Sequence, residues 1–303
     1  MRGLATFMHS RHRPVRMKAF LLASLSLAVS AIAADKIKVL IVDGQNNHQW
    51  KMTTPVLKQI LEEPGIFSVD VSTSPEKGSK SSETWRPKFS DYAVVVSNYN
   101  GEPWSTATKD AFEKFVSGGG GFVSVHAADN SFPEWPAYNE MIGLGGWGGR
   151  NEKSGPYLRL RDGKWTLDTT PGRGGSHGRQ HEFALNNREP SHPIMHGLPA
   201  AFMHRQDELY NSLRGPAKNV TVLASALSPK EMGGSGEEEP LLMVIPFGKG
   251  RVVHDALGHG AEAVHCVAFA VTLQRATEWA ATGKVTQKVP ADFPDDKKSK
   301  DRP

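Results

Sequence analysis

One stretch of the chain, residues 118–129, constrains the fold more than any other. Its apolar segment, residues 122–125, is rich in β-branched side chains and predicts a buried strand of a parallel sheet. A helical pattern with its apolar residues on one face precedes the strand at residues 105–116. The strand stops at His126, and because small residues follow, a tight strand-to-helix turn that resembles a nucleophile elbow is expected there.

His126 is therefore the first candidate functional residue. In an open α/β sheet, ligands bind in the crevice beyond the carboxyl ends of the strands. His126 is predicted to lie at such an end, and the alternative is that its imidazole only caps the turn that follows. The pattern thus predicts where a pocket lies, and says less about its chemistry.

Strands and helices alternate around this stretch. Further strands of the sheet are predicted at residues 36–43, 67–71, 91–97, 220–224, 241–245 and 251–255. A helix is predicted from Thr53 to Leu61 and a closing helix from about Ala263 to Thr282, where Gly283 ends it. This succession predicts an α/β fold, a parallel sheet with right-handed crossovers that is flanked by helices and carries a β-rich, loop-rich insertion.

We find no repeat and no linker that would divide the 303 residues into two cores. A single domain is predicted over residues 34–284. Residues 285–303 end in a charge-rich segment and are expected to form a solvated, disordered tail.

The first 33 residues are predicted to be an export signal. Basic residues between Arg11 and Lys18 precede an apolar run, residues 19–33, which ends in the cleavage pattern Ala31-Ile32-Ala33. The run is short for a bilayer span, and a start at Met17 would leave a complete signal. Cleavage would release a periplasmic or secreted chain that begins near Ala34 and has no stable membrane association. An uncleaved anchor is the alternative.

The charge balance gives no support for a nucleic-acid partner. The signal segment holds five of the 36 basic residues and no acidic residue, which leaves 31 basic and 32 acidic residues in the rest of the chain. The basic character of the whole sequence therefore comes mainly from the export signal. The single cysteine, Cys266, cannot form an internal disulfide, and its apolar helical context indicates a buried, inert thiol.

Polar residues follow several predicted strands and would meet in one crevice. Imidazoles beside carboxylates transfer protons near neutral pH, which suits acid–base catalysis. The catalytic candidates chosen on this ground are His126, His259, His48, Asp207 and Glu208. The same residue types bind Zn²⁺, but no spacing among them is diagnostic, so a divalent metal stays an open alternative.

Other polar and aromatic residues are candidates for substrate binding. Trp147 and Arg150, in the glycine-rich segment 143–150, offer an aromatic face and a donor fork that suit sugars or carboxylates. The alternatives are a packed glycine-rich connection and, for the asparagines, local turn hydrogen bonds. The complete set is Asn46, Asn47, Asn98, Trp147, Arg150 and Tyr210. A structural role is expected for the remaining histidines His177, His204, His254 and His265.

Taken in order, several short motifs resemble the ThuA-like (trehalose utilisation) family over residues 36–284. The motifs are Asn46-Asn47-His48-Gln49-Trp50, residues 119–129 with His126 at the turn, Gly145-Gly146-Trp147, Ser191-His192-Pro193-Ile194, Asp207-Glu208-Leu209-Tyr210 and Gly258-His259-Gly260. The resemblance implies a single-domain flavodoxin-like fold of the class I glutamine amidotransferase-like superfamily. It also implies a role in sugar metabolism, on oxidised (keto) glycosides. The parent amidotransferases carry Cys where His126 stands, so glutamine hydrolysis is not expected.

The sequence thus favours an exported enzyme that acts on a glycoside or keto-glycoside by acid–base chemistry, with a small-molecule sugar as its partner. A 3-keto group acidifies the neighbouring C–H bond, so a base with a pKa near 7 could start elimination or isomerisation. His126 would act as base or acid, with His259 or His48 as its partner. A sugar-binding module without chemistry and a metal-dependent hydrolase are the alternatives. The exact substrate and the oligomeric state, including a homo-oligomer, stay open.

Overall fold

A computed structural model describes residues 1–4, 8 and 35–302. The helices and strands lie in the unit Asp35–Pro303, and the preceding residues, Met1–Ala34, form a separate unit. The predicted export signal lies almost entirely outside the described residues. Among the residues that are described, no helix combines the length and the apolar composition needed to cross a bilayer.

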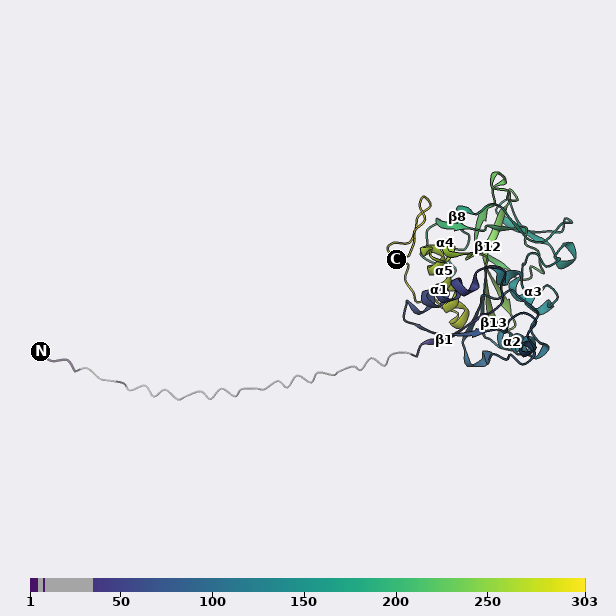
Figure 1. The fold of residues 1–303 in the computed structure, drawn as a ribbon. Coiled ribbons are helices and arrows are strands. Elements are labelled where there is room, and N and C mark those ends of the chain that lie inside the picture. The colour runs from purple at the N-terminus through teal and green to yellow at the C-terminus, as the bar shows by residue number, and fades with distance from the viewer. Residues whose placement is uncertain (5–7, 9–34, 303) are drawn as a thin grey trace. The chain divides into compact units, whose positions relative to one another are not determined.

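A nine-stranded sheet forms the centre of the larger unit, with the order β2-β1-β3-β4-β13-β12-β11-β8-β9 (Figure 1). Its first five strands pair in parallel. They are β2 (Phe67–Thr73), β1 (Ile37–Asp43), β3 (Val94–Ser97), β4 (Gly121–Val125) and β13 (Gly250–Asp255). The other four are β12 (Glu238–Phe247), β11 (Thr221–Leu227), β8 (His181–Asn187) and β9 (Ala201–Asp207).

The prediction of a parallel sheet is correct for one half of the sheet and wrong for the other. From β13 onward each strand pairs antiparallel with the next. Only Gly248 and Lys249 separate β12 from β13. A link of this length closes a hairpin, whereas a parallel connection needs a crossover of a dozen or more residues. The fold is therefore α/β with a large mixed sheet.

Two layers of helices cover the sheet (Figure 1). The helices α1 (Trp50–Glu62), α4 (Ala261–Val264) and α5 (Val267–Thr282) pack on one face. The helices α2 (Thr106–Ser117) and α3 (Pro136–Ile142) pack on the other. The predicted closing helix is thus divided in two, because Cys266 has an extended backbone. Gly283 ends α5 in the left-handed conformation, as expected.

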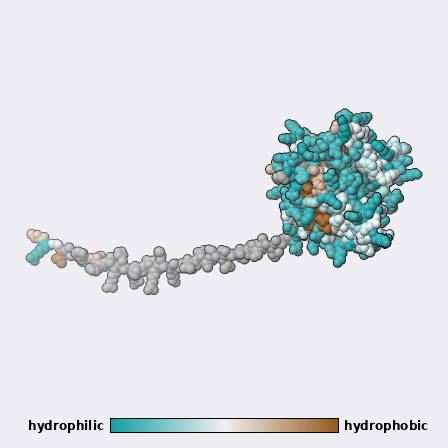
Figure 2. Space-filling view, in the orientation of Figure 1, coloured by the Kyte–Doolittle hydropathy of each residue, from teal (hydrophilic) through white to brown (hydrophobic). Residues whose placement is uncertain are grey.

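Smaller strand pairs complete the fold. A hairpin is formed by β5 (Tyr157–Arg161) and β6 (Lys164–Asp168), and β7 (Ser176–His177) pairs antiparallel with β10 (Tyr210–Asn211). The face of this unit seen in Figure 2 is mainly hydrophilic. Large hydrophobic side chains that stay exposed within residues 35–302 are Val71, Trp147, Leu167 and Leu227.

The charge-rich tail differs from the solvated segment that the sequence predicts. Its backbone is hydrogen bonded to the domain: the Met203 N–H donates to the Asp295 carbonyl over 2.7 Å, and the Val267 N–H donates to the Lys300 carbonyl over 2.8 Å. Asp301 also forms an ion pair with Arg205 at 2.9 Å. These contacts place the end of the tail against β9 and the start of α5.

Candidate functional site

His126 lies directly after β4, as the first residue of the 3₁₀ turn His126–Asn130. Its φ angle is +50°, a left-handed conformation that is uncommon for a residue other than glycine. The residue is 2% exposed. Its Nδ1 is 2.9 Å from the carbonyl oxygen of Ala256, which follows the adjacent strand β13. Since a carbonyl oxygen only accepts, Nδ1 carries the hydrogen and Nε2 faces the site.

Glu208 is the centre of the site, because four imidazoles direct Nε2 toward its carboxylate. Oε2 lies 3.5 Å from Nε2 of His126 and 3.7 Å from Nε2 of His48. Oε1 lies 3.2 Å from Nε2 of His259 and 3.6 Å from Nε2 of His177. The residues come from the ends of β4, β1, β13 and β9 and from β7. The structure thus brings together the polar residues that follow separate strands, as the sequence predicts.

Contacts within this cluster change its protonation. Burial alone would raise the pKa of Glu208, but the His126 and His48 imidazoles outweigh that effect and hold the pKa well below its usual value. Burial lowers the pKa of His259, an effect that the Glu208 carboxylate only partly offsets. At neutral pH the site therefore contains an ionised carboxylate beside a neutral His259.

Asp207 lies behind the cluster and holds its loops in place. Its carboxylate accepts hydrogen bonds from the backbone N–H of Glu208 at 2.8 Å, of Gly258 at 2.8 Å and of His259 at 3.1 Å. The same carboxylate also has a buried side-chain partner, His204, whose Nε2 lies 2.8 Å from Oδ2 of Asp207. Asp207 is 1% exposed, so it positions Glu208 and His259 and does not line the cavity.

His48, His177 and Glu208 of the cluster form one wall of a cavity of about 450 Å³, whereas the buried His126 is not among its lining residues. Tyr210 stacks on His126 with ring centroids 4.3 Å apart, and its hydroxyl oxygen is 2.9 Å from Nε2 of His126. Trp147 contacts Tyr210 with ring centroids 4.8 Å apart and stays 38% exposed. The cavity is lined by Asn47, His48, Asn100, Asn130, Trp147, His177, Glu208 and Tyr210.

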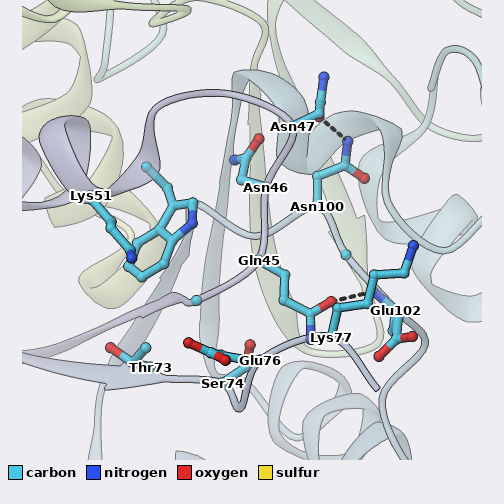
Figure 3. A pocket seen from close by; sticks show the side chains of 13 residues that line it. Gln45, Asn46, Asn47, Lys51, Thr73, Ser74, Glu76, Lys77, Asn100 and Glu102 are labelled. Carbon is cyan, nitrogen blue, oxygen red and sulfur yellow. Dashed lines mark hydrogen bonds between the residues drawn. The ribbon is translucent and has the colours of Figure 1, made fainter. Parts of the chain in front are cut away.

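A second, larger cavity of about 710 Å³ adjoins the first (Figure 3). Asn47 and Asn100 line both cavities, and the amide of Asn100 donates to the Asn47 side chain over 2.8 Å between them. The other polar residues that line the second cavity include Gln45, Asn46 and Lys77. Amides that both donate and accept hydrogen bonds suit a polyhydroxylated ligand.

Asn46 and Asn98 do not have the expected position in the cavity beside the cluster. Asn46 lines the second cavity, and its Oδ1 lies 3.2 Å from Nδ1 of His48, which orients that imidazole. Asn98 is 5% exposed, and its amide donates to the hydroxyls of Thr53 and Thr54, each over 3.0 Å. Asn98 therefore ties β3 to α1, and its assignment to substrate binding is wrong.

Arg150 is also a structural residue, contrary to the prediction. It is 4% exposed, and all five of its N–H donors are directed at protein oxygens. The acceptors are the carbonyls of Asn130, Gly146 and Ser131 and the side chain of Asn139, at 2.8–3.3 Å. No donor is left for a ligand. Arg150 stabilises the glycine-rich segment that carries Trp147.

His177 was assigned a structural role from the sequence, yet it lies in the site. Pairing of β7 with β10 places it opposite Tyr210. Its Nδ1 faces the Gly178 carbonyl at 2.8 Å, so Nε2 again points to Glu208. A two-residue strand after a glycine-rich loop leaves no periodic pattern, so the sequence held little sign of this position. His204 and His254 are buried structural residues, as expected, and His265 is exposed.

Comparisons with known proteins agree with the fold. The sequence profile of the family described as ThuA, trehalose utilisation, matches residues 38–280. A ThuA-like protein from Parabacteroides merdae ATCC 43184 has 48% identity and a TM-score of 0.86, and the match covers 88% of this chain and 98% of that one. A ThuA-like protein from Bacteroides uniformis ATCC 8492 has 22% identity and a TM-score of 0.58, and the match covers 84% of this chain and 94% of that one.

A cytoplasmic protein, STM3548 from Salmonella typhimurium, has 10% identity and a TM-score of 0.50, and the match covers 80% of this chain and 99% of that one. A search of curated proteins found no match. These findings confirm the expected fold class, an α/β fold with a sheet flanked by helices.

Proposed function

Because this chain belongs to the ThuA family, we propose that it is a carbohydrate-metabolism enzyme that acts on a glycoside or keto-glycoside by imidazole acid–base chemistry. The family's description, trehalose utilisation, supports the role in carbohydrate metabolism. The observation that carries the chemistry is the set of four imidazoles around the Glu208 carboxylate. An ionised carboxylate beside His126 stabilises the imidazolium that forms when His126 takes up a proton.

In a 3-keto glycoside, the carbonyl acidifies the C–H bond next to it. A base removes that proton, the electron pair forms a C=C bond, and the glycosidic C–O bond breaks. The departing oxygen takes a proton, so the products are an unsaturated keto sugar and an alcohol. His126 takes the proton from carbon, and the imidazolium so formed gives it to the departing oxygen, directly or through His48 or His259, since the centroids of both rings lie within 5.3 Å of the His126 ring centroid.

The cavities support a sugar of more than one residue. Trp147 offers an exposed aromatic face on which a pyranose ring can stack beside the cluster, and the buried ring of Tyr210 supports it. The second cavity, joined to the first at Asn47 and Asn100, has room and amide groups for a further sugar residue (Figure 3). A disaccharide would thus place its glycosidic bond near the boundary of the two cavities.

We also infer that the protein works outside the cytoplasm. The support is the basic segment before residues 19–33, the apolar run itself and the Ala31-Ile32-Ala33 cleavage pattern.

The experiment that tests the proposed function incubates the purified protein with a 3-keto-disaccharide and with the unoxidised disaccharide, and follows the products by NMR and mass spectrometry. His126→Ala is compared with His265→Ala, which removes an exposed histidine outside the cluster. Turnover that is lost in His126→Ala and kept in His265→Ala supports the proposal. Equal turnover in both variants contradicts it. Saturable binding without turnover in the wild type would favour a sugar-binding module instead.

A further inference from the structure

We propose that His48, His126, His259 and Glu208 bind one divalent cation of the zinc class. One ligand atom from each of the four residues lies within 4.8 Å of the others. The inference concerns the same residues as the proposed function and goes beyond it. Binding of the cation is a separate property that is measured by itself.

The orientation of the imidazoles supports coordination through Nε2. Nδ1 of His126 faces the Ala256 carbonyl at 2.9 Å, and Nδ1 of His48 faces Oδ1 of Asn46 at 3.2 Å. Oxygen atoms of this kind accept the Nδ1 hydrogen, so Nε2 is the nitrogen that can bind a metal. At His126 the Tyr210 hydroxyl, 2.9 Å from Nε2, would have to turn away from that nitrogen when the metal binds. Histidine ligands in metalloproteins are held by such hydrogen bonds on the second ring nitrogen.

The distances match a tetrahedral centre. Zinc binds imidazole nitrogen and carboxylate oxygen at about 2.0–2.2 Å, so two ligand atoms of a tetrahedral site lie about 3.3 Å apart. The Glu208 oxygens lie 3.2 Å from Nε2 of His259, 3.5 Å from that of His126 and 3.7 Å from that of His48. The four ligand atoms lie within 4.8 Å of one another, so a bound cation would draw the more distant ones together by up to about 1.5 Å.

The centre of the cluster suits a positive charge. A carboxylate surrounded by imidazole nitrogens is stabilised by a proton or a cation that lies between them. Imidazole and carboxylate ligands together favour zinc and neighbouring transition metals over Mg²⁺, which prefers oxygen ligands. His177, with Nε2 3.6 Å from the Glu208 carboxylate, lies beside this group on the cavity side.

The surrounding structure holds the four ligands before any metal arrives. Asp207 fixes the backbone of Glu208 and His259. A preformed site of this kind loses little conformational entropy on binding. With the cation bound, the Nε2 lone pairs of the three imidazoles are engaged, so metal binding and imidazole acid–base chemistry are alternatives that the experiments below distinguish.

The test uses the full chain purified from its expression host and treated with a chelator. Zn²⁺ is titrated by calorimetry and counted by elemental analysis, with Mg²⁺ as the comparison. We expect one Zn²⁺ per chain and no saturable binding of Mg²⁺. Substitution with Co²⁺ should give the visible absorption of a tetrahedral site, a readout that does not depend on activity.

The variants are His259→Ala and Glu208→Gln, with His265→Ala as the control. Loss of a ligand should weaken Zn²⁺ binding by more than about 100-fold, because loss of an outer partner alone costs about 10- to 100-fold. Circular dichroism of the metal-free variants checks folding. His48→Ala is a third variant, since His48 lies at the edge of the cluster with 15% of its side chain exposed.

Three results would overturn the inference: absence of saturable Zn²⁺ binding, more than one equivalent site, or binding unchanged in His259→Ala and Glu208→Gln. Zn²⁺ binding without turnover would support the metal site and contradict the proposed function. Turnover that depends on His126 in a protein that binds no Zn²⁺ would do the reverse.

Discussion

Nε2 of His204 lies 2.8 Å from the carboxylate of Asp207, and both side chains are fully shielded from solvent. The same carboxylate accepts the backbone N–H groups of Glu208 and His259. A buried ion pair therefore connects β9 to two loops that carry site residues. Its disruption should affect both the stability of the fold and the geometry of the cluster.

We expect Asp207→Asn to lower the free energy of unfolding by about 3–5 kcal/mol, because it leaves the buried His204 without its charged partner. Urea unfolding of the metal-free protein measures the change. Asp110→Asn, on the exposed side of α2, is the matched control and should change the free energy of unfolding by less than about 0.5 kcal/mol. Equal unfolding midpoints for the two variants would show that the pair does not stabilise the fold.

Acid should destabilise the protein through His254. Burial lowers the pKa of this histidine to about 3, whereas the unfolded chain has a pKa near 6.5. Below pH 6.5 the unfolded chain takes up a proton that the folded chain does not, which favours unfolding. The contribution of neutral His254 to the free energy of unfolding is therefore fully present above pH 6.5 and is lost as the pH falls toward 3. Urea unfolding at pH 7 and pH 4.5 should show a smaller loss of stability in His254→Gln than in the wild type. A loss of the same size in both proteins would assign the acid sensitivity to other groups.

Arg150→Lys should destabilise the glycine-rich segment although it keeps the charge. Lysine has three donors in place of five and cannot reproduce the planar fork. Buried carbonyls that lose a donor cost about 1–3 kcal/mol, which thermal and urea unfolding would detect. Arg173→Lys, at an exposed position of the neighbouring loop, is the control. If sugar affinity falls while stability is unchanged, Arg150 binds the ligand after all.

Trp147→Ala should weaken sugar binding by about 10-fold, because stacking on an aromatic ring is worth about 0.5–1.5 kcal/mol beyond the area it buries. The change should appear as a higher KM with little change in kcat, since Trp147 does not contact His126 or Glu208 through any hydrogen bond found in the described residues. Leu227→Ala removes another exposed hydrophobic side chain as a control. A fall in kcat at constant KM would instead give Trp147 a part in the chemistry.

If residues 1–33 are an export signal, we expect the amino terminus of the protein to be cleaved. Expressed from Met1 in a bacterial host, the protein should be recovered outside the cytoplasm with a mass that begins at Ala34. Ala33→Arg should block cleavage and leave a longer chain in the membrane fraction. Recovery of unprocessed wild-type protein from the cytoplasm would contradict the export signal.

Much of the site could be predicted from local sequence because the carboxyl ends of parallel strands meet at one edge of a sheet. His48, His126 and His259 each follow a strand of the parallel half, so recognising the strands was enough to place them together. Glu208 was predicted with them and proved to be the centre of the cluster. The strands themselves were visible because their apolar runs are short and rich in β-branched residues.

The tertiary structure decided the rest. The sequence around Arg150 does not distinguish a ligand-binding arginine from a structural one. Only the structure shows that its guanidinium donates to backbone carbonyls and so has a structural role. His177 enters the site through a two-residue strand pair with no periodic signal. The positions of β8 and β9 beside β11 likewise depend on which strands folding brings together, whereas the two-residue link between β12 and β13 already favours their hairpin. Local sequence thus determined the strands, the turns and the residues at their ends, whereas the role of each polar side chain depended on partners distant in the chain, because a hydrogen bond or an ion pair is set by the groups that folding brings within about 3 Å.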